Sequence, residues 1–285
     1  MPRVAVAQFS GSRNHEENAA AVERLTARAV GDGAQLLCFH ELANTVYLPF
    51  AEDRELFSLA ESEDGWTVRA ARGLARRHGI VLVYPFFERD GERYFNTAIV
   101  FGTAGETLGK YRKTSVPTSR LLPGANERFF FAPGDLGFPV VQTPFGVRVG
   151  LIICYDRNLP EPARCAALNG TDLLFVPVTT TTKVLPWWEL LLRARAVENV
   201  FYVAAPSRVG ADRGGAPEAS YIGMSLIVDP RGEIVARGND AGEDVVCADL
   251  DLELLERQRQ LWTFFQDRRP DQYGVLTGQH RPAGR

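Results

Sequence analysis

The sequence predicts one α/β domain built from two β-sheets with helices on the outside. Short apolar runs recur along all 285 residues, and stretches with helical periodicity separate many of them. Several runs are apolar at consecutive positions, which is typical of strands covered on both faces. Strand–helix units occur early and again late in the chain, with a run of strands between them. This weak repetition favours two stacked sheets.

The expected strands are short runs bounded by turn residues. The first is the alternating segment Val4–Phe9, close to the N-terminus. The others span residues 36–39, 80–86, 97–101, 147–155, 172–178, 200–205, 224–229 and 244–250.

Helical patterns lie between several of these strands, and their ends carry recognisable signals. The expected helices cover residues 14–31, 68–78, 160–168 and 186–199. Asn14 and Glu17 can form a capping pair at the start of the first helix. In the last helix, Leu190, Ala194 and Val197 share one face. We expect residues 1–285 to form a single domain with a C-terminal tail from about residue 256.

The composition restricts the class of protein. Hydrophobic residues make up 45% of the chain and charged residues 24%, as in ordinary globular proteins. The 32 basic and 35 acidic residues give a net charge of −3, so no basic field is available for nucleic acid. No apolar run approaches the roughly 18 residues that span a bilayer, and no signal peptide is evident. We therefore expect neither nucleic acid nor a membrane as partner.

The four cysteines, Cys38, Cys154, Cys165 and Cys247, lie far apart in the sequence. They show no CxxC spacing, so they predict neither a disulfide framework nor a zinc site. A reducing, cytoplasmic location is the simplest expectation.

Histidine is the usual catalytic base, but the histidines here do not favour that role. They are His15, His40, His78 and His280. His40 precedes Glu41 at a strand end, where successive side chains point to opposite faces. Sites of the Ser/His/Asp, Cys/His or metal-binding type are therefore disfavoured.

Three other residues, Glu41, Lys113 and Cys154, lie at or just after predicted strand ends. Taken singly, each has an ordinary interpretation: a solvated strand end, a solvated basic cluster and a core cysteine. If these ends share one rim, a carboxylate, an ammonium and a thiol converge. The ammonium can then lower the thiol pKa and hold an oxyanion, while the carboxylate moves the proton.

The sequence resembles the nitrilase superfamily of carbon–nitrogen hydrolases, whose hallmark is a Glu–Lys–Cys triad. The similarity extends over essentially the whole chain, and His40 replaces the family's usual proline before the glutamate. The matching motifs cover residues 39–41, 109–113, 150–156, 169–172, 193–199 and 267–271. The resemblance implies a four-layer α–β–β–α sandwich and catalysis by Glu41, Lys113 and Cys154 without a metal or organic cofactor.

The resemblance also implies further site residues. Glu127, within residues 123–129, matches a second family glutamate, and the backbone N–H of Tyr155 would join Lys113 in holding the oxyanion. Family members form dimers or larger assemblies, so we expect a homo-oligomer in which the aromatic segment 262–265 packs on the partner. The expected substrate-binding residues are Tyr47, Arg157, Thr179 and Thr180.

Nitrile-specific members typically carry Cys-Trp-Glu at the nucleophile, whereas residues 154–157 read Cys-Tyr-Asp-Arg and resemble the carbamoyl amidases. The sequence therefore predicts a small-molecule substrate, an N-carbamoyl amino acid or N-carbamoyl amine, which is cleaved through a thioester. Hydrolysis of a simple carboxamide, as by an ω-amidase, is the enzymatic alternative. A silent scaffold that binds partners is the non-enzymatic one. Arg157 either recognises a substrate carboxylate or pairs with Asp156 or Glu161.

Overall fold

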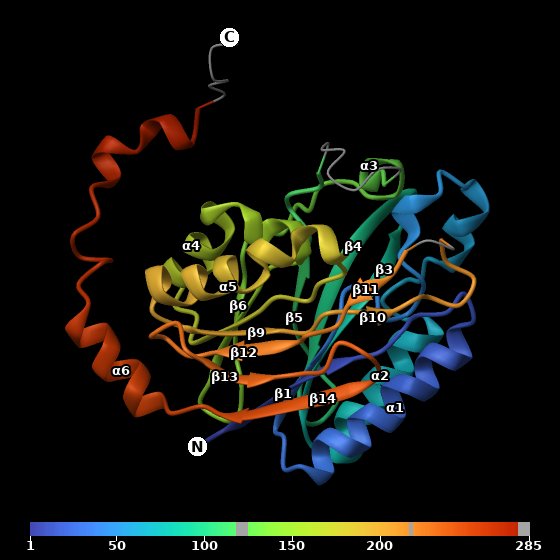
Figure 1. The fold of residues 1–285 in the computed structure, drawn as a ribbon, viewed down its shortest axis with the longest axis horizontal. Coiled ribbons are helices and arrows are strands. Elements are labelled where there is room, and N and C mark those ends of the chain that lie inside the picture. The colour runs from blue at the N-terminus through green and yellow to red at the C-terminus, as the bar shows by residue number, and fades with distance from the viewer. Residues whose placement is uncertain (118–124, 217–218, 279–285) are drawn as a thin grey trace.

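The computed structural model describes residues 1–117, 125–216 and 219–278, and its two six-stranded sheets form the centre of the molecule (Figure 1). Apolar side chains from both sheets form the core between them, including Val6, Cys38, Val149 and Val203. Helices cover the outer faces, so the predicted α/β architecture of two sheets with outer helices is confirmed.

The first sheet has the order β14-β1-β2-β3-β4-β5. Helices α1 (His15–Gly31) and α2 (Trp66–His78) pack on its outer face through a second apolar cluster. Its strands are β1 (Arg3–Gln8), β2 (Leu36–Phe39), β3 (Val81–Asp90), β4 (Arg93–Phe101), β5 (Thr107–Arg112) and β14 (Asp244–Asp249).

The second sheet has the order β13-β12-β9-β8-β7-β6, and α4 (Pro160–Leu168) and α5 (Leu185–Asn199) cover it. Its strands are β6 (Val140–Gln142), β7 (Arg148–Leu151), β8 (Leu173–Phe175), β9 (Tyr202–Ala205), β12 (Leu226–Val228) and β13 (Ile234–Arg237). Besides short 3₁₀ helices, the described residues also form α3 (Glu127–Phe130), α6 (Leu252–Leu261) and a two-stranded ribbon of β10 (Val209–Gly210) and β11 (Tyr221–Ile222).

The predicted strand over residues 147–155 ends earlier than expected. Strand β7 stops at Leu151, and residues Cys154–Asn158 form a 3₁₀ turn. Ile152 and Ile153 remain fully buried although they lie outside the strand. The apolar run therefore marked burial, and the sequence could not show where the backbone leaves the sheet.

The first helix begins as predicted, but its cap differs. The Asn14 side chain accepts a hydrogen bond from the Glu16 backbone N–H at 2.8 Å. Glu17 is not used in a capping box and instead pairs with Arg213 at 2.9 Å.

Helix α5 buries a different face from the stripe noted in its sequence. Leu190 and Val197 are 62% and 41% exposed, whereas Trp188, Leu192 and Ala196 are fully buried. Because this helix carries apolar residues on two faces, periodicity alone does not tell which one contacts the sheet.

The C-terminal segment leaves the two sheets after α6 and extends along one side of the molecule (Figure 1). Trp262 and Phe264 stack on each other at 5.3 Å between ring centroids, and both remain exposed. None of the helices in the described parts of the chain is both long and apolar enough to cross a membrane.

Candidate active site

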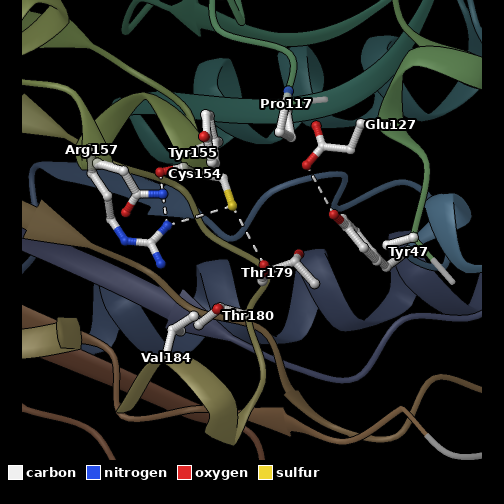
Figure 2. Close-up of a pocket in the computed structure, with 11 residues that line it drawn as sticks. Tyr47, Pro117, Glu127, Cys154, Tyr155, Arg157, Thr179, Thr180 and Val184 are labelled. Carbon is white, nitrogen blue, oxygen red and sulfur yellow. Dashed lines mark hydrogen bonds between the residues drawn. The ribbon is translucent and has the colours of Figure 1, made fainter. Parts of the chain in front are cut away.

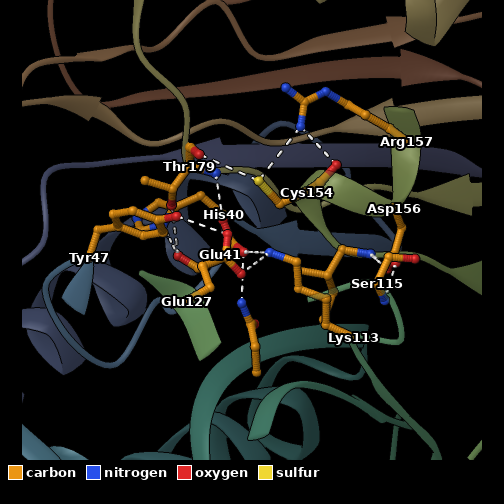
Figure 3. Close-up of polar contacts among 12 residues, drawn as sticks. His40, Glu41, Tyr47, Lys113, Ser115, Glu127, Cys154, Asp156, Arg157 and Thr179 are labelled. Atoms are coloured by element: carbon orange, nitrogen blue, oxygen red, sulfur yellow. Dashed lines mark hydrogen bonds and ion pairs between the residues drawn. The ribbon is translucent and has the colours of Figure 1, made fainter. Parts of the chain in front are cut away.

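The structure brings Glu41, Lys113 and Cys154 together beyond the ends of strands from the two sheets (Figure 3). Each follows the end of a strand: β2 ends at Phe39, β5 at Arg112 and β7 at Leu151. The Nζ of Lys113 donates to Oε1 of Glu41 at 3.1 Å. Glu41 and Lys113 thus come from the first sheet and Cys154 from the second, as expected for strand ends on a shared rim.

Thr179 joins the carboxylate to the thiol. Its backbone N–H donates to Oε2 of Glu41 at 2.9 Å, and its carbonyl accepts from Sγ of Cys154 at 3.4 Å. On the other side, the Asn96 amide donates to Oε1 of Glu41 at 2.7 Å. Glu41 is fully buried, so these donors and Lys113 supply the hydrogen bonds that water would otherwise give to its carboxyl oxygens.

Lys113 lies between two carboxylates. Besides Glu41, it contacts Oε2 of Glu127 at 2.5 Å, and its side chain is fully buried. Burial alone would lower the pKa of Lys113, but Glu127 and Glu41 outweigh it and raise that pKa above its usual range. The ammonium therefore stays charged at neutral pH.

Glu127 begins helix α3 and faces the same cluster. The Tyr47 hydroxyl donates to Oε1 of Glu127 at 3.0 Å. Burial and then the charge of Glu41 raise the pKa of Glu127, against the opposing effect of Lys113. Pro123 and Gly124, which belong to the sequence motif around Glu127, lie outside the described residues.

Cys154 occupies a strained turn. Its φ angle is +47°, in the left-handed region that non-glycine residues rarely adopt. Burial and the nearby Glu41 raise the pKa of Cys154 to about 12, although Lys113 and Arg157 lower it. The ammonium of Lys113 thus lowers the thiol pKa, as expected, but burial and Glu41 outweigh it. The resting thiol is therefore protonated at neutral pH.

Asp156 ties the cysteine turn to the lysine segment. This fully buried carboxylate accepts from the backbone N–H groups of Ile153 and Ser115, each at 2.9 Å, and from the Tyr111 hydroxyl at 2.7 Å. One residue thereby fixes the chain just before Cys154 and just after Lys113. Apart from the presence of Asp156 in the cysteine motif, nothing in the amino-acid pattern indicates this role.

A pocket opens on Cys154, and Figure 2 shows the residues around it. All four predicted substrate-binding residues line it, as do Glu127 and Tyr155. Glu41 and Lys113 lie behind its wall, fully or almost fully buried. The lining residues that sequence reasoning missed are Pro117, Ala125, Asn158 and Val184.

Arg157 does not make the ion pairs that were the alternative to carboxylate recognition. Its Nη1 donates to the Cys154 carbonyl at 2.8 Å and contacts Sγ of Cys154 at 3.6 Å. Asp156 is satisfied by the other donors, and within the described residues no carboxylate lies in salt-bridge range of Arg157. The guanidinium is almost fully buried at the pocket wall, so an anionic ligand can pair with Arg157 without displacing a carboxylate of the described residues.

Within the described parts of the chain, no histidine side chain belongs to this cluster of acidic, basic and thiol groups. His40 is buried beside Phe9, and its Nδ1 contacts the Glu41 carbonyl at 3.0 Å. Burial lowers the pKa of His40 well below its usual value, so it is neutral. His280 lies outside the described residues. Across residues 1–117, 125–216 and 219–278, no three His, Cys, Asp or Glu side chains are grouped to hold a metal ion.

Comparison with known proteins agrees with the architecture and gives the family. A family model described as carbon-nitrogen hydrolase matches residues 3–260. N-carbamoylputrescine amidase of Arabidopsis thaliana is 34% identical, with 94% of this chain and 93% of that protein covered. Citrullinase of Francisella tularensis is 33% identical over 96% of this chain and 97% of its own length.

Among solved structures, a carbon–nitrogen hydrolase from Helicobacter pylori G27 superposes with a TM-score of 0.90. It is 30% identical and covers 98% of this chain, and 99% of its own chain is matched. The fold expected from the resemblance, the α–β–β–α sandwich of this superfamily, is thereby supported along the whole chain. The protein described here belongs to the carbon–nitrogen hydrolase family of the nitrilase superfamily, and it is an amidohydrolase.

Proposed function

We propose that this enzyme hydrolyses N-carbamoyl compounds to the amine, ammonia and carbon dioxide, with Cys154 as nucleophile. The observation that carries the proposal is the contact of Lys113 with both Glu41 and Glu127, directly behind a pocket that opens on Cys154. A buried thiol, two carboxylates and one ammonium suffice for covalent hydrolysis of an amide or ureido carbonyl. The similarity to N-carbamoylputrescine amidase and citrullinase favours the ureido group.

The proposed mechanism begins with transfer of the Cys154 proton to Glu41. The thiolate then attacks the substrate carbonyl, and Lys113 with the backbone N–H of Tyr155 holds the oxyanion. Each such donor is worth about 3–4 kcal/mol in the transition state. Glu41 returns the proton to the departing nitrogen, which leaves the carbonyl and the second nitrogen on Cys154 as an S-carbamoyl group (a thiocarbamate). Water hydrolyses this S-carbamoyl group, with Glu127 positioning substrate and water, and returns the thiol and a carbamic acid. The carbamic acid then breaks down to carbon dioxide and the second nitrogen, so that both the amine and ammonia are released.

The raised pKa of Cys154 fits this order of events. A thiol that is protonated at rest needs a base at the moment of attack. Lys113 remains charged next to both carboxylates, so it serves the oxyanion rather than proton transfer. The cluster keeps its net charge when the proton moves from Sγ to Glu41, which limits the cost of forming the thiolate in a buried site.

Within the carbamoyl class, we propose an acidic substrate, such as an N-carbamoyl amino acid. Arg157 carries the argument, because its guanidinium lines the pocket and is not neutralised by a described carboxylate. An arginine fork matches a carboxylate in bidentate fashion, and such charge-assisted pairs are stronger than neutral hydrogen bonds.

Replacing Arg157 by glutamine is expected to raise KM for an N-carbamoyl amino acid by roughly 10-fold or more, which corresponds to loss of a charge-assisted pair. KM for an uncharged N-carbamoyl analogue should change much less. Steady-state kinetics on the two substrates checks this. Equal KM changes would show that Arg157 only holds the cysteine turn, and a wild-type preference for carbamoyl amines would reject the acidic substrate.

A panel of N-carbamoyl acids, N-carbamoyl amines and simple carboxamides, scored by ammonia release, tests the substrate class. We expect turnover of the carbamoyl compounds, with the acids preferred. Faster turnover of carboxamides would identify an ω-amidase instead. The absence of ammonia from every member of the panel would favour the silent scaffold.

We also propose that the protein is a homodimer or larger homo-oligomer in a reducing, cytoplasmic environment. The exposed face of α5 presents Trp187, Leu190 and Val197, and the tail presents Trp262 and Leu276. Exposed apolar side chains grouped on one helix face are the kind of surface that a second protein chain can cover. The reducing environment is supported by the four cysteines, all of which are free thiols. Light scattering should give a mass of at least two chains, and a monomer mass would contradict the proposal.

A further inference from the structure

The backbone around Glu41 converges on a single side chain. After β2 the chain turns sharply, and Leu42 has a φ of +53°. The carbonyl oxygens of Glu41, Leu42 and Thr45 all accept from Nη2 of Arg208, at 2.9, 2.8 and 3.0 Å. This turn is not a regular element, so a distant side chain supplies the partners that a helix or sheet would otherwise give.

Arg208 lies between β9 and β10, so it is far from β2 in the sequence although its side chain contacts the turn that follows β2. It is fully buried, and its Nη1 pairs with Oδ1 of Asp212 at 2.8 Å. Gly11 lies against this pair: its backbone N–H donates to Oδ1 of Asp212, and a Cβ at Gly11 would lie 2.0 Å from Nη1 of Arg208. The backbone at Gly11 thus packs directly against the Arg208–Asp212 ion pair and leaves no room for a side chain there.

Two further contacts connect the ion pair to the reacting groups. Nε of Arg208 donates to Oγ1 of Thr179 at 3.2 Å, and Thr179 contacts both the Glu41 carboxylate and Sγ of Cys154. Oδ2 of Asp212 accepts from the backbone N–H of Tyr47 at 2.7 Å. Tyr47 in turn donates to Glu127. One buried pair therefore touches the supports of both carboxylates.

We propose that Arg208 and Asp212 form a positioning pair that fixes Glu41 against Cys154 and Tyr47 against Glu127. The proposal rests on the catalytic roles proposed above for Glu41 and Cys154. Neither Arg208 nor Asp212 lines the pocket, so their effect is exerted through the residues they hold. A planar guanidinium donates in several fixed directions at once, which the single ammonium of lysine does not reproduce.

The first test is Asp212→Asn, which preserves shape and removes the charge that orients Arg208. We expect kcat to fall by about 10²-fold, as for small misplacements of a catalytic group, while KM changes much less. The rate at which iodoacetamide alkylates Cys154 should fall as well, because Glu41 is then misplaced for accepting the thiol proton.

Asp172→Asn is the matched control. Asp172 is also a largely buried carboxylate with arginine partners, Arg148 at 2.8 Å and Arg259 at 2.7 Å, but it does not line the pocket. This variant should lower Tm and leave kcat and the alkylation rate unchanged. The proposal is wrong if Asp212→Asn lowers Tm but not kcat. It is also wrong if the two variants lower Tm equally and Asp212→Asn lowers kcat no more than Asp172→Asn does, because the pair is then merely structural.

Arg208→Lys supplies a second variant, which retains the positive charge beside Asp212. We expect a folded protein in which kcat and alkylation are still reduced, since the ammonium cannot serve all the acceptors. Wild-type kcat in this variant would contradict the proposal, as would failure of both variants to fold while Asp172→Asn folds. Alkylation uses no carbamoyl substrate, so an error in the proposed substrate class leaves this test intact.

Discussion

Replacement of Cys154 by alanine should abolish hydrolysis and leave the protein folded. The variant removes the proposed nucleophile, and losses of roughly 10⁴-fold or more are typical when such a group is deleted. Among the described residues, the polar contacts of the thiol are both long, to the Thr179 carbonyl at 3.4 Å and to Arg157 at 3.6 Å. Turnover by ammonia release, with circular dichroism and Tm on the same sample, checks both parts.

The other cysteines provide the controls for this experiment. Cys38, Cys165 and Cys247 lie away from the pocket, so alanine at Cys165 or Cys247 should leave kcat unchanged. Cys38 is fully buried, and its replacement should affect Tm more than kcat. More than trace turnover in folded Cys154→Ala would refute the nucleophile assignment.

The second large effect is expected for Glu41→Gln. Glutamine keeps the shape of the side chain but cannot accept the thiol proton, so turnover should fall by the roughly 10²–10⁴-fold typical of lost general acid–base catalysis. A variant with near-wild-type turnover would show that Glu41 is not the base.

The same variant should change how alkylation of Cys154 depends on pH. Burial and then Glu41 raise the thiol pKa to about 12 in the wild-type protein. The variant removes the charge of Glu41 but not the burial, which is the larger cause, so below the remaining thiol pKa the thiolate fraction still rises with pH. Without the Glu41 base, the rate of alkylation should follow this fraction and rise about tenfold per pH unit through the neutral range. In the wild-type protein Glu41 accepts the proton, and the dependence should be weaker. Identical pH profiles would contradict the proton transfer to Glu41.

Much of the fold was predictable because its signals are local. Buried strands and amphipathic helices leave apolar patterns in the sequence, and the capping residue Asn14 and the helix-ending Gly79 mark element boundaries. The buried face of α5 was not predictable, since Leu190 and Leu192 are equally apolar and only tertiary packing separates them.

The candidate site was predictable to the extent that its groups follow strand ends. Glu41, Lys113 and Cys154 each carry that signal, and the family resemblance joined them. Arg208 carries no such signal, because its role depends on three carbonyl oxygens that only the folded chain brings to one point. The direction in which the pKa of Cys154 shifts was likewise not predictable from the sequence, since it depends on how deeply the folded chain buries the thiol.

The central claim is that Cys154 forms a covalent intermediate with a ureido carbonyl. Rapid quenching of the wild-type enzyme with an N-carbamoyl amino acid, followed by peptide mass spectrometry, tests this directly. During the first turnover, the peptide that contains Cys154 should carry a substrate-derived carbamoyl group, and the peptides with Cys38, Cys165 and Cys247 should not. Turnover with Cys154 unmodified at every quench time, or with the group on another residue, would contradict the account.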